Sequence, residues 1–263
     1  MIRFVMSDLD GTLVPEGTCV LPQRLVDALN ELQRCGIPFA ASSGRQHASI
    51  RNVFRVLEEE PMIVSLNGGC ICKGDECLYL DPMPRETALA IAAEAGTYPG
   101  CDVILETKDQ CWVYVGENGI IPELDLRSYR YAPVTNLNEV EGEVIKVACY
   151  IPHGVEAFQK QAEAHWGYQV TVARSGGLWV DFNVADKGKG LRAACNLLGV
   201  DPEDTAAFGD NLNDEAMLAA AGQPFVAANG NPALLERYPV SEDPVADIEK
   251  ISKNLKKRLA FQK

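Results

Sequence analysis

The sequence predicts an α/β fold: a doubly wound core with a Rossmann-like parallel sheet, and an inserted α+β cap domain. Short apolar runs alternate with helical patterns near both ends of the chain, which is the rhythm of a parallel sheet. Each of these runs ends in an acid, a small polar residue or a glycine. Ligands of open α/β sheets bind at such carboxyl ends. A middle region with strands and helices in a different order interrupts this rhythm and indicates the insertion.

The first strand is predicted over the apolar run that begins at Phe4, and it ends in Asp8 and Asp10. Unpaired buried charge costs several kcal/mol, so two acids at the end of a buried strand need a cation. We therefore expect a cation site at the carboxyl end of a central strand.

The first half of the core continues as helix, strand, helix, strand and hairpin. Pro22 suits the first turn of the first helix, and Gly36 is a stop signal after it. The predicted elements are a helix over 22–32, a strand over 37–41, a helix through Leu57, a strand over 62–66 and a hairpin over 70–80.

The middle of the chain reads as an α+β unit with antiparallel strands. Its predicted elements are a helix over 85–95, strands over 102–106, 111–115 and 144–151, a helix over 154–166, and a strand pair over 169–173 and 178–182. The segment 116–142 has no assignable pattern. We interpret residues 82–182 as the cap, and residues 1–81 and 183–263 as the catalytic core.

The α/β rhythm returns after the cap. The predicted elements are a helix over 187–198, a strand over 205–208, a helix through Ala221, a strand over 224–227, and short helices over 233–237 and 245–259.

Composition narrows the classes of function. The chain has 263 residues, of which 47% are hydrophobic, and a net charge of −13. The acidic balance disfavours a nucleic-acid partner, which needs a basic face. No stretch approaches the roughly 20 apolar residues that cross a bilayer. We expect no membrane partner and, since no signal-peptide layout is visible, a cytoplasmic location. Nothing in the sequence indicates an oligomeric state.

The polar strand ends suit phosphoryl transfer, which mainly needs charge neutralisation and in-line positioning. Asp8 and Asp210 would offer oxygen ligands to Mg²⁺. A carboxylate can attack phosphorus, and Asp8 stands at the strand tip for that role. Asp10 could give a proton to the leaving oxygen and later take one from water. Groups that would hold the phosphoryl oxygens are the backbone N–H groups of the Leu9, Gly11 and Thr12 turn, the Ser43 hydroxyl and Lys187.

These residues carry a resemblance to a known family. Asp8-Leu9-Asp10-Gly11-Thr12 resembles the DxDGT signature of the haloacid dehalogenase superfamily of phosphohydrolases. Ser43 is similar to the residue of its second motif, Lys187 to the lysine of its third, and the segment 209–214 to its GDxxND motif. The insertion after the third strand resembles the Cof-type branch, which has an α/β cap.

The resemblance implies roles for these residues. Asp8 would be the nucleophile and Asp10 the general acid and base. The metal ligands would be the Asp8 carboxylate, the Asp10 carbonyl and Asp210. Asp214 would orient a metal-bound water or Lys187, and Asn213 would lie near the phosphate or that water.

Other residues are weaker candidates for substrate contact. Gly44, Asn67 and Gly68 could form turns or present their backbone to the substrate. Arg45 could be solvated, structural or substrate-binding, and Arg174 of the cap could reach the substrate.

Some residues are interpreted structurally. We interpret Cys70, Cys72 and Cys77 as buried thiols of a hairpin, because no histidine lies near them in sequence and their spacing is not that of two CxxC pairs; zinc is the less favoured alternative. The three histidines, His47, His153 and His165, are expected on the surface, and the three tryptophans, Trp112, Trp166 and Trp179, in the core of the cap. Lys189 has no predicted role.

The sequence as a whole predicts a Mg²⁺-dependent phosphatase. It would hydrolyse a small phosphorylated metabolite, a sugar phosphate or similar, through a phospho-aspartate intermediate. Cofactor phosphates and nucleotides stay open as substrates. The alternatives are a phosphomutase of the same superfamily and a non-catalytic phosphate-binding regulator.

Overall fold

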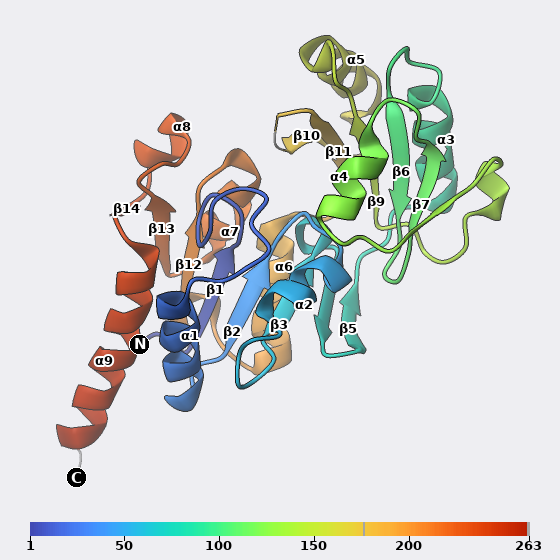
Figure 1. The fold of residues 1–263 in the computed structure, drawn as a ribbon. Coiled ribbons are helices and arrows are strands. Elements are labelled where there is room, and N and C mark those ends of the chain that lie inside the picture. The colour runs from blue at the N-terminus through green and yellow to red at the C-terminus, as the bar shows by residue number, and fades with distance from the viewer. Residues whose placement is uncertain (176, 262–263) are drawn as a thin grey trace.

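The computed structural model describes residues 1–175 and 177–261, which form two sheets with their own helices (Figure 1). The larger sheet has eight strands in the order β14-β13-β12-β1-β2-β3-β4-β5. Its strands are β1 (Phe4–Asp8), β2 (Phe39–Ser42), β3 (Met62–Ser65), β4 (Cys70–Lys73), β5 (Glu76–Leu80), β12 (Thr205–Gly209), β13 (Gln223–Ala227) and β14 (Val240–Ser241). The strands from β14 to β3 pair in parallel, and β4 and β5 form an antiparallel hairpin.

Helices cover both faces of this sheet, which confirms the doubly wound core. One apolar cluster joins the sheet to α1 (Gln23–Arg34), α2 (His47–Phe54) and α9 (Pro244–Phe261). A second cluster joins the opposite face to α6 (Lys187–Leu198), α7 (Glu215–Ala220) and α8 (Pro232–Leu235). The alternation of side chains along a strand lets β1, β2, β3, β12 and β13 contribute to both clusters.

The smaller sheet has six strands in the order β10-β11-β9-β6-β7-β8. Its strands are β6 (Asp102–Glu106), β7 (Cys111–Val115), β8 (Tyr131–Pro133), β9 (Lys146–Tyr150), β10 (Thr171–Ser175) and β11 (Trp179–Asn183). The helices α3 (Arg85–Ala95) and α5 (Val155–Trp166) share an apolar cluster with one face of the sheet. The cluster against α4 (Ile120–Leu126) lies on the other face.

The structure assigns the segment that the sequence left open. It holds α4, β8 and a short 3-10 turn over Leu137–Glu139. The pairing of β7 with β8 is parallel, whereas we expected only antiparallel strands in this part of the chain. Several further expectations differ at their ends: α2 stops at Phe54, β10 begins and ends two residues later than expected, α8 ends at Leu235, and the last helix runs to Phe261. The division into core and cap at residues 81–82 and 182–183 stays a prediction.

A close backbone approach positions the start of α6. Gly68 has a φ of +94°, and a Cβ there would lie 2.2 Å from the carbonyl oxygen of Asp186. A Cβ on Gly190 would lie 2.9 Å from the Cα of Gly68. The turn after β3 and the first turn of α6 therefore need glycine at both positions, and this contact sets the position of Lys187.

Lys189 and His47 have structural surroundings that the sequence did not indicate. Lys189 Nζ donates a 2.7 Å hydrogen bond to the carbonyl oxygen of Val184, where the chain returns from the smaller sheet. His47 was expected on the surface but is half-buried, because it opens α2, which packs on the large sheet. Within the described ranges, no helix has the length and apolar character needed to cross a membrane.

Candidate active site

A cavity of about 160 Å³ lies where the carboxyl ends of β1, β2 and β12 face the smaller sheet. The larger sheet and its loops contribute Asp8, Asp10, Gly11, Glu16, Ser43, Gly44, Arg45, Asp210, Asn211 and Asn213. The smaller sheet and its loops contribute Glu106, Leu124, Arg127, Tyr129, Lys146, Ser175, Trp179 and Asp181. The polar ends of β1, β2 and β12 therefore converge on one cavity, as the topology of a parallel sheet predicts, whereas the end of β3 does not line it.

Lys187 joins the first strand to the loop after β12. Its ammonium group forms ion pairs with Asp8 and Asp214, and all three side chains are buried. Burial alone would lower the pKa of Lys187, but the carboxylates of Asp214 and Asp8 raise it above its usual value. Lys187 is therefore a permanent cation beneath the cavity.

One ammonium group does not balance the carboxylates around it. Burial raises the pKa of Asp8 well above its usual value; Lys187 partly offsets this, and Asp214 and Asp210 add to it. Burial also raises the pKa of Asp210. Carboxylate oxygens of Asp8, Asp210 and Asp214 all lie within 4.8 Å of one another. This cluster is short of positive charge, so its donor set fits a hard divalent cation.

Both carboxylate oxygens of Asp214 accept hydrogen bonds from protein groups. Its Oδ1 accepts from Lys187, and its Oδ2 accepts from the backbone N–H groups of Asp210 and Asn211, at 2.9 and 3.0 Å. Asp214 therefore orients Lys187 and the Asp210 loop, while Asp8 and Asp210 keep oxygen atoms for a cation.

The loop after β1 closely surrounds Asp210. Thr12 Oγ1 donates a 2.7 Å hydrogen bond to Asp210 Oδ1. Gly11 has a φ of +84°, and a Cβ there would lie 2.5 Å from Asp210 Oδ2. Asn229 Nδ2 donates to the carbonyl oxygen of Gly11 at 2.9 Å. These contacts fix the carboxylate of Asp210 opposite Asp8.

Asp10 lies further out and has different partners. Its carboxylate forms an ion pair with Arg45, which is 5% exposed, and accepts a 3.1 Å hydrogen bond from the backbone N–H of Gly17. The guanidinium group of Arg45 also contacts the carbonyl oxygen of Thr18. Arg45 is therefore a buried partner of Asp10 at the cavity wall.

The smaller sheet brings a buried charged group to the cavity. Lys146 Nζ lies 2.7 Å from Glu106 Oε1 and 3.5 Å from Asp181 Oδ2, and it donates a 2.8 Å hydrogen bond to the carbonyl oxygen of Gly44. Asn67 Nδ2 donates to Asp181 Oδ2 at 3.0 Å. These contacts connect the smaller sheet to the loops that follow β2 and β3.

Glu106 lacks a directional partner within this group. Glu106 and Lys146 form an ion pair, but its angles are not those of a hydrogen bond. Neither carboxylate oxygen of Glu106 accepts a hydrogen bond from the described residues. Burial raises the pKa of Glu106, and Lys146 opposes that rise. A buried acceptor at a cavity wall is suited to a donor group on a ligand.

The predicted site residues divide into three groups by position. Those that line the cavity are Asp8, Asp10, Gly11, Ser43, Gly44, Arg45, Asp210 and Asn213. Those that lie behind it are Leu9, Thr12, Lys187 and Asp214, which are all buried. Asn67 and Gly68 do not line it, since Asn67 binds Asp181 and Gly68 packs on the backbone of Asp186.

Arg174 does not reach the cavity, contrary to what we considered. Its guanidinium group binds Glu156 Oε1 at 2.8 Å and the carbonyl oxygen of Gly177 at 2.6 Å, and the side chain is exposed. Its neighbour Ser175 lines the cavity instead. Trp179 likewise lines it, whereas Trp112 and Trp166 pack with the cluster against α3 and α5, as expected.

Sequence reasoning missed Glu106, Lys146 and Asp181. A signal was present, because Lys146 and Asp181 are each a single charge within an apolar run and Glu106 ends one. Such a charge is costly in a buried strand unless it is paired, so its presence indicates a partner in the fold.

Comparisons with known proteins find relatives that match most of the chain. The family model of the haloacid dehalogenase-like hydrolases matches residues 5–241. A phosphoglycolate phosphatase from Methanopyrus kandleri is 26% identical over 229 residues, which cover 87% of this chain and 85% of the relative. The pyridoxal phosphate phosphatase YbhA of Escherichia coli is 26% identical over 258 residues, with coverage of 89% and 91%.

Solved structures share the fold. A haloacid dehalogenase-like hydrolase from Bacteroides thetaiotaomicron superposes with a TM-score of 0.81 at 20% identity, over 95% of this chain and 100% of the other. Another from Bacillus subtilis gives a TM-score of 0.81 at 20% identity, over 97% and 99%.

Proposed function

The chain belongs to the haloacid dehalogenase-like hydrolase family, and we propose that it is a Mg²⁺-dependent phosphatase that hydrolyses a small phosphorylated metabolite through a phospho-aspartate intermediate. The observation that carries this proposal is the position of Asp8. Its buried carboxylate lies at a strand end, against Lys187 and beside Asp210. The phosphatases among its relatives support the same reaction.

Asp8 would act as the nucleophile. One of its carboxylate oxygens attacks phosphorus, and the bond from phosphorus to the leaving oxygen breaks. Lys187 holds the other carboxylate oxygen and fixes the direction of attack. Water then attacks the acyl phosphate, and phosphate leaves with Asp8 restored.

Asp10 would move the protons of both steps. It gives a proton to the leaving oxygen in the first step and takes one from the attacking water in the second. Its ion pair with Arg45 holds the carboxylate at the cavity wall, where both steps take place.

Asp8, Asp210 and the carbonyl oxygen of Asp10 would hold the magnesium ion. When bound, the ion supplies charge neutralisation at the transferring phosphoryl group. Thr12 and Gly11 hold Asp210 in place for this role. Asn213 lines the same wall and is suited to contact the phosphoryl group.

The substrate would be a hydroxylated phosphate ester, such as a sugar phosphate. A small phosphate ester fits the cavity of about 160 Å³. Its outer wall offers the unsatisfied carboxylate of Glu106, the hydroxyl group of Ser175 and the ring of Trp179. Carboxylates accept hydrogen bonds from sugar hydroxyl groups, and an aromatic ring packs against the apolar face of a sugar.

The smaller sheet and its helices would form the cap, over residues 82–182, on a core of residues 1–81 and 183–263. A cap that closes over the site excludes water from the reaction. Lys146 supports this arrangement, because it reaches from the smaller sheet to the backbone of Gly44.

We also propose a cytoplasmic location, because the nine cysteines are all free thiols.

Turnover of an aryl phosphate with Mg²⁺ tests the proposal. Asp8→Asn should abolish turnover, with a loss on the order of 10⁴-fold or more, because no nucleophile remains. Asp10→Asn should lower kcat by about 10²- to 10⁴-fold. The matched control is Asp27→Asn, an exposed carboxylate on α1, which should keep wild-type turnover. Full activity in Asp8→Asn would contradict the assigned nucleophile.

Two further measurements separate the alternatives. A phosphomutase would return the phosphoryl group to its substrate, so release of inorganic phosphate in step with substrate loss excludes it. A regulator would hold the phosphoryl group without turnover. A panel of phosphorylated metabolites would then identify the leaving group, and we expect the hydroxylated members to give the highest kcat/KM.

A further inference from the structure

We propose that Cys70, Cys72 and Cys77 form a binding site for a thiophilic divalent cation, and that this cation is Zn²⁺. The site lies on the β4–β5 hairpin, and none of the three thiols lines the cavity described above. The proposal is independent of the phosphatase reaction.

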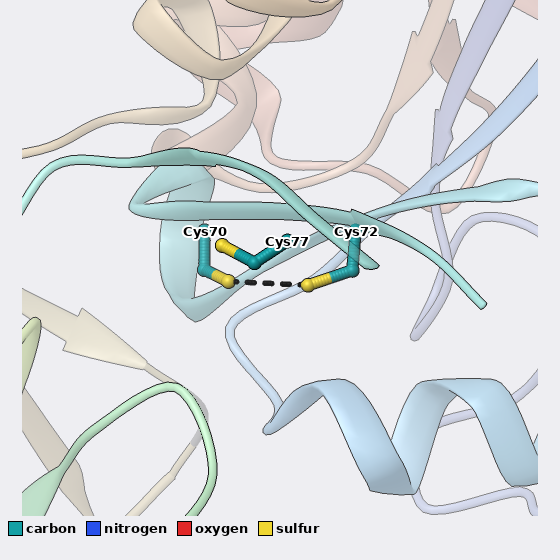
Figure 2. A group of neighbouring side chains, drawn as sticks. All are labelled: Cys70, Cys72 and Cys77. Atoms are coloured by element: carbon teal, nitrogen blue, oxygen red, sulfur yellow. Dashed lines mark hydrogen bonds between the residues drawn. The ribbon is translucent and has the colours of Figure 1, made fainter. Parts of the chain in front are cut away.

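The hairpin brings the three sulfur atoms together. Cys70 and Cys72 stand on β4 with one residue between them, so both side chains leave the same side of the strand. Cys77 lies on β5 directly opposite Cys72. Figure 2 shows Cys77 between Cys70 and Cys72, with its sulfur turned toward Cys70 and a dashed line joining Cys70 and Cys72.

The distances suit a shared metal ion. Cys70 Sγ lies 3.5 Å from Cys72 Sγ, and all three sulfur atoms lie within 4.8 Å of one another. Zinc–sulfur bonds of about 2.3 Å place neighbouring ligand sulfurs about 3.8–4.0 Å apart in tetrahedral or trigonal geometry. The 3.5 Å between Cys70 and Cys72 is slightly shorter than this value, and no pair of the three sulfurs exceeds 4.8 Å, so small rotations of the side chains would suffice.

The surroundings favour a soft cation over a hard one. The thiols pack against Leu66, Ile145 and Leu80, which offer no oxygen ligands from their side chains. Thiolates select zinc and similar soft ions. Three thiolates leave one net negative charge around a divalent ion and two around a monovalent ion. In a buried site the smaller residual charge costs less.

Solvent reaches the site from one direction. Cys70 and Cys72 are buried, whereas Cys77 is half-buried, so a fourth ligand such as water can enter on its side.

A disulfide explains the cluster less well. It would use two of the three sulfur atoms and leave the third without a role. A link between Cys70 and Cys72 would also require the two sulfurs to close from 3.5 Å to about 2.05 Å within one strand. The spacing of these cysteines in sequence disfavoured zinc, but the hairpin supplies the third ligand across the strand pair.

The experiment uses the full chain, reduced and freed of metal, with Mg²⁺ in excess to occupy the aspartate cluster. Cd²⁺ added alone as a probe should give thiolate-to-cadmium absorption that saturates at one equivalent, and excess Zn²⁺ should compete with it. Cys77→Ser should weaken Cd²⁺ binding by at least about 10-fold. Mutation of a residue that only hydrogen-bonds to a metal ligand already lowers affinity by that much, so loss of a ligand should cost no less. Cys35→Ser, another half-buried thiol, should bind like the wild type.

Alkylation gives a second measurement that needs no variant. Zn²⁺ should slow modification of Cys70, Cys72 and Cys77 and leave the rate at Cys35 unchanged, as mapped by mass spectrometry. Absence of the absorption at one equivalent, or equal protection of all the cysteines, overturns the proposal. A purified chain in which two of the three thiols are linked, and which binds no Cd²⁺ after reduction, overturns it in favour of a redox pair.

Discussion

Thr12 Oγ1 donates a 2.7 Å hydrogen bond to Asp210 Oδ1, although 198 positions separate the two residues in the chain. The bond joins the loop after β1 to the loop after β12, which are neighbours only because their strands pair in parallel. It holds the carboxylate of Asp210 across from Asp8. The proposed metal site therefore depends on a contact between the two distant parts of the core.

Thr12→Val should raise the Mg²⁺ concentration for half-maximal activity by about 10- to 100-fold, because Asp210 loses the partner that orients it. Thr12→Ser keeps the hydroxyl group and should stay near the wild type. The measurement is turnover of an aryl phosphate against Mg²⁺ concentration. An unchanged Mg²⁺ dependence in Thr12→Val would show that this bond does not support the metal site.

Gly68→Ala should destabilise the protein more than Gly36→Ala, although both glycines have positive φ. The backbone conformation alone costs an alanine about 1–2 kcal/mol. No atom of the described residues lies within 4 Å of a Cβ at Gly36, whereas one at Gly68 meets the carbonyl oxygen of Asp186 at 2.2 Å. We expect about 1–3 kcal/mol of further loss at Gly68 from overpacking.

Activity separates the same two variants. Displacement of Asp186 moves Lys187, so kcat should fall in Gly68→Ala and not in Gly36→Ala. Urea unfolding and kcat measured on both variants test this pair of expectations. Equal losses of stability and activity would mean that the contact does not position α6.

Lys146→Met should lower the free energy of unfolding by about 3–5 kcal/mol, because it leaves Glu106 and Asp181 buried without their cation. KM should also rise, since the hydrogen bond to the backbone of Gly44 is lost. Lys253→Met is the control: its ion pair with Glu249 is exposed and contributes about 0.3–0.5 kcal/mol. Similar stability of the two variants would contradict the buried role of Lys146.

His47 should make the protein less stable as the pH falls. Burial and the charge of Arg51 lower the pKa of His47 below its ordinary value of 6.5. Between the ordinary and the lowered pKa, the unfolded chain binds more protons than the folded one, so stability is lost as the pH falls through that window.

The free energy of unfolding should therefore fall more between about pH 7 and about pH 5 in the wild type than in His47→Gln. His153→Gln, at an exposed position, should follow the wild type. Urea unfolding at a series of pH values gives the comparison, and identical slopes for the wild type and His47→Gln would refute it.

Much of the core could be predicted because local patterns set it. The apolar run that ends in Asp8 and the helix that begins at Lys187 carry their own start and stop signals, and the structure has elements at both places. The segment 116–142 lacked such signals, because α4 and β8 are short and owe their order to packing on the smaller sheet.

The outer wall of the site could not be predicted in the same way. Arg174 looked available for substrate, but Glu156 and Gly177 lie close enough to bind it locally. Lys146 and Glu106 looked like single charges in strands, and only the approach of the two sheets turns them toward the cavity. Their role depends on distances between separate layers, which no local pattern encodes.

By itself, the sequence determined the alternation of strands and helices, the polar strand ends and the family to which the chain belongs. Hydrophobic period and turn residues act over a few positions, so they can be read along the chain. The tertiary structure decided which charges face one another: Arg45 against Asp10, Lys146 among carboxylates of the smaller sheet, and a third thiol across a hairpin. Such pairings arise because packing brings distant segments within a few ångströms, where charge and bonding geometry begin to act.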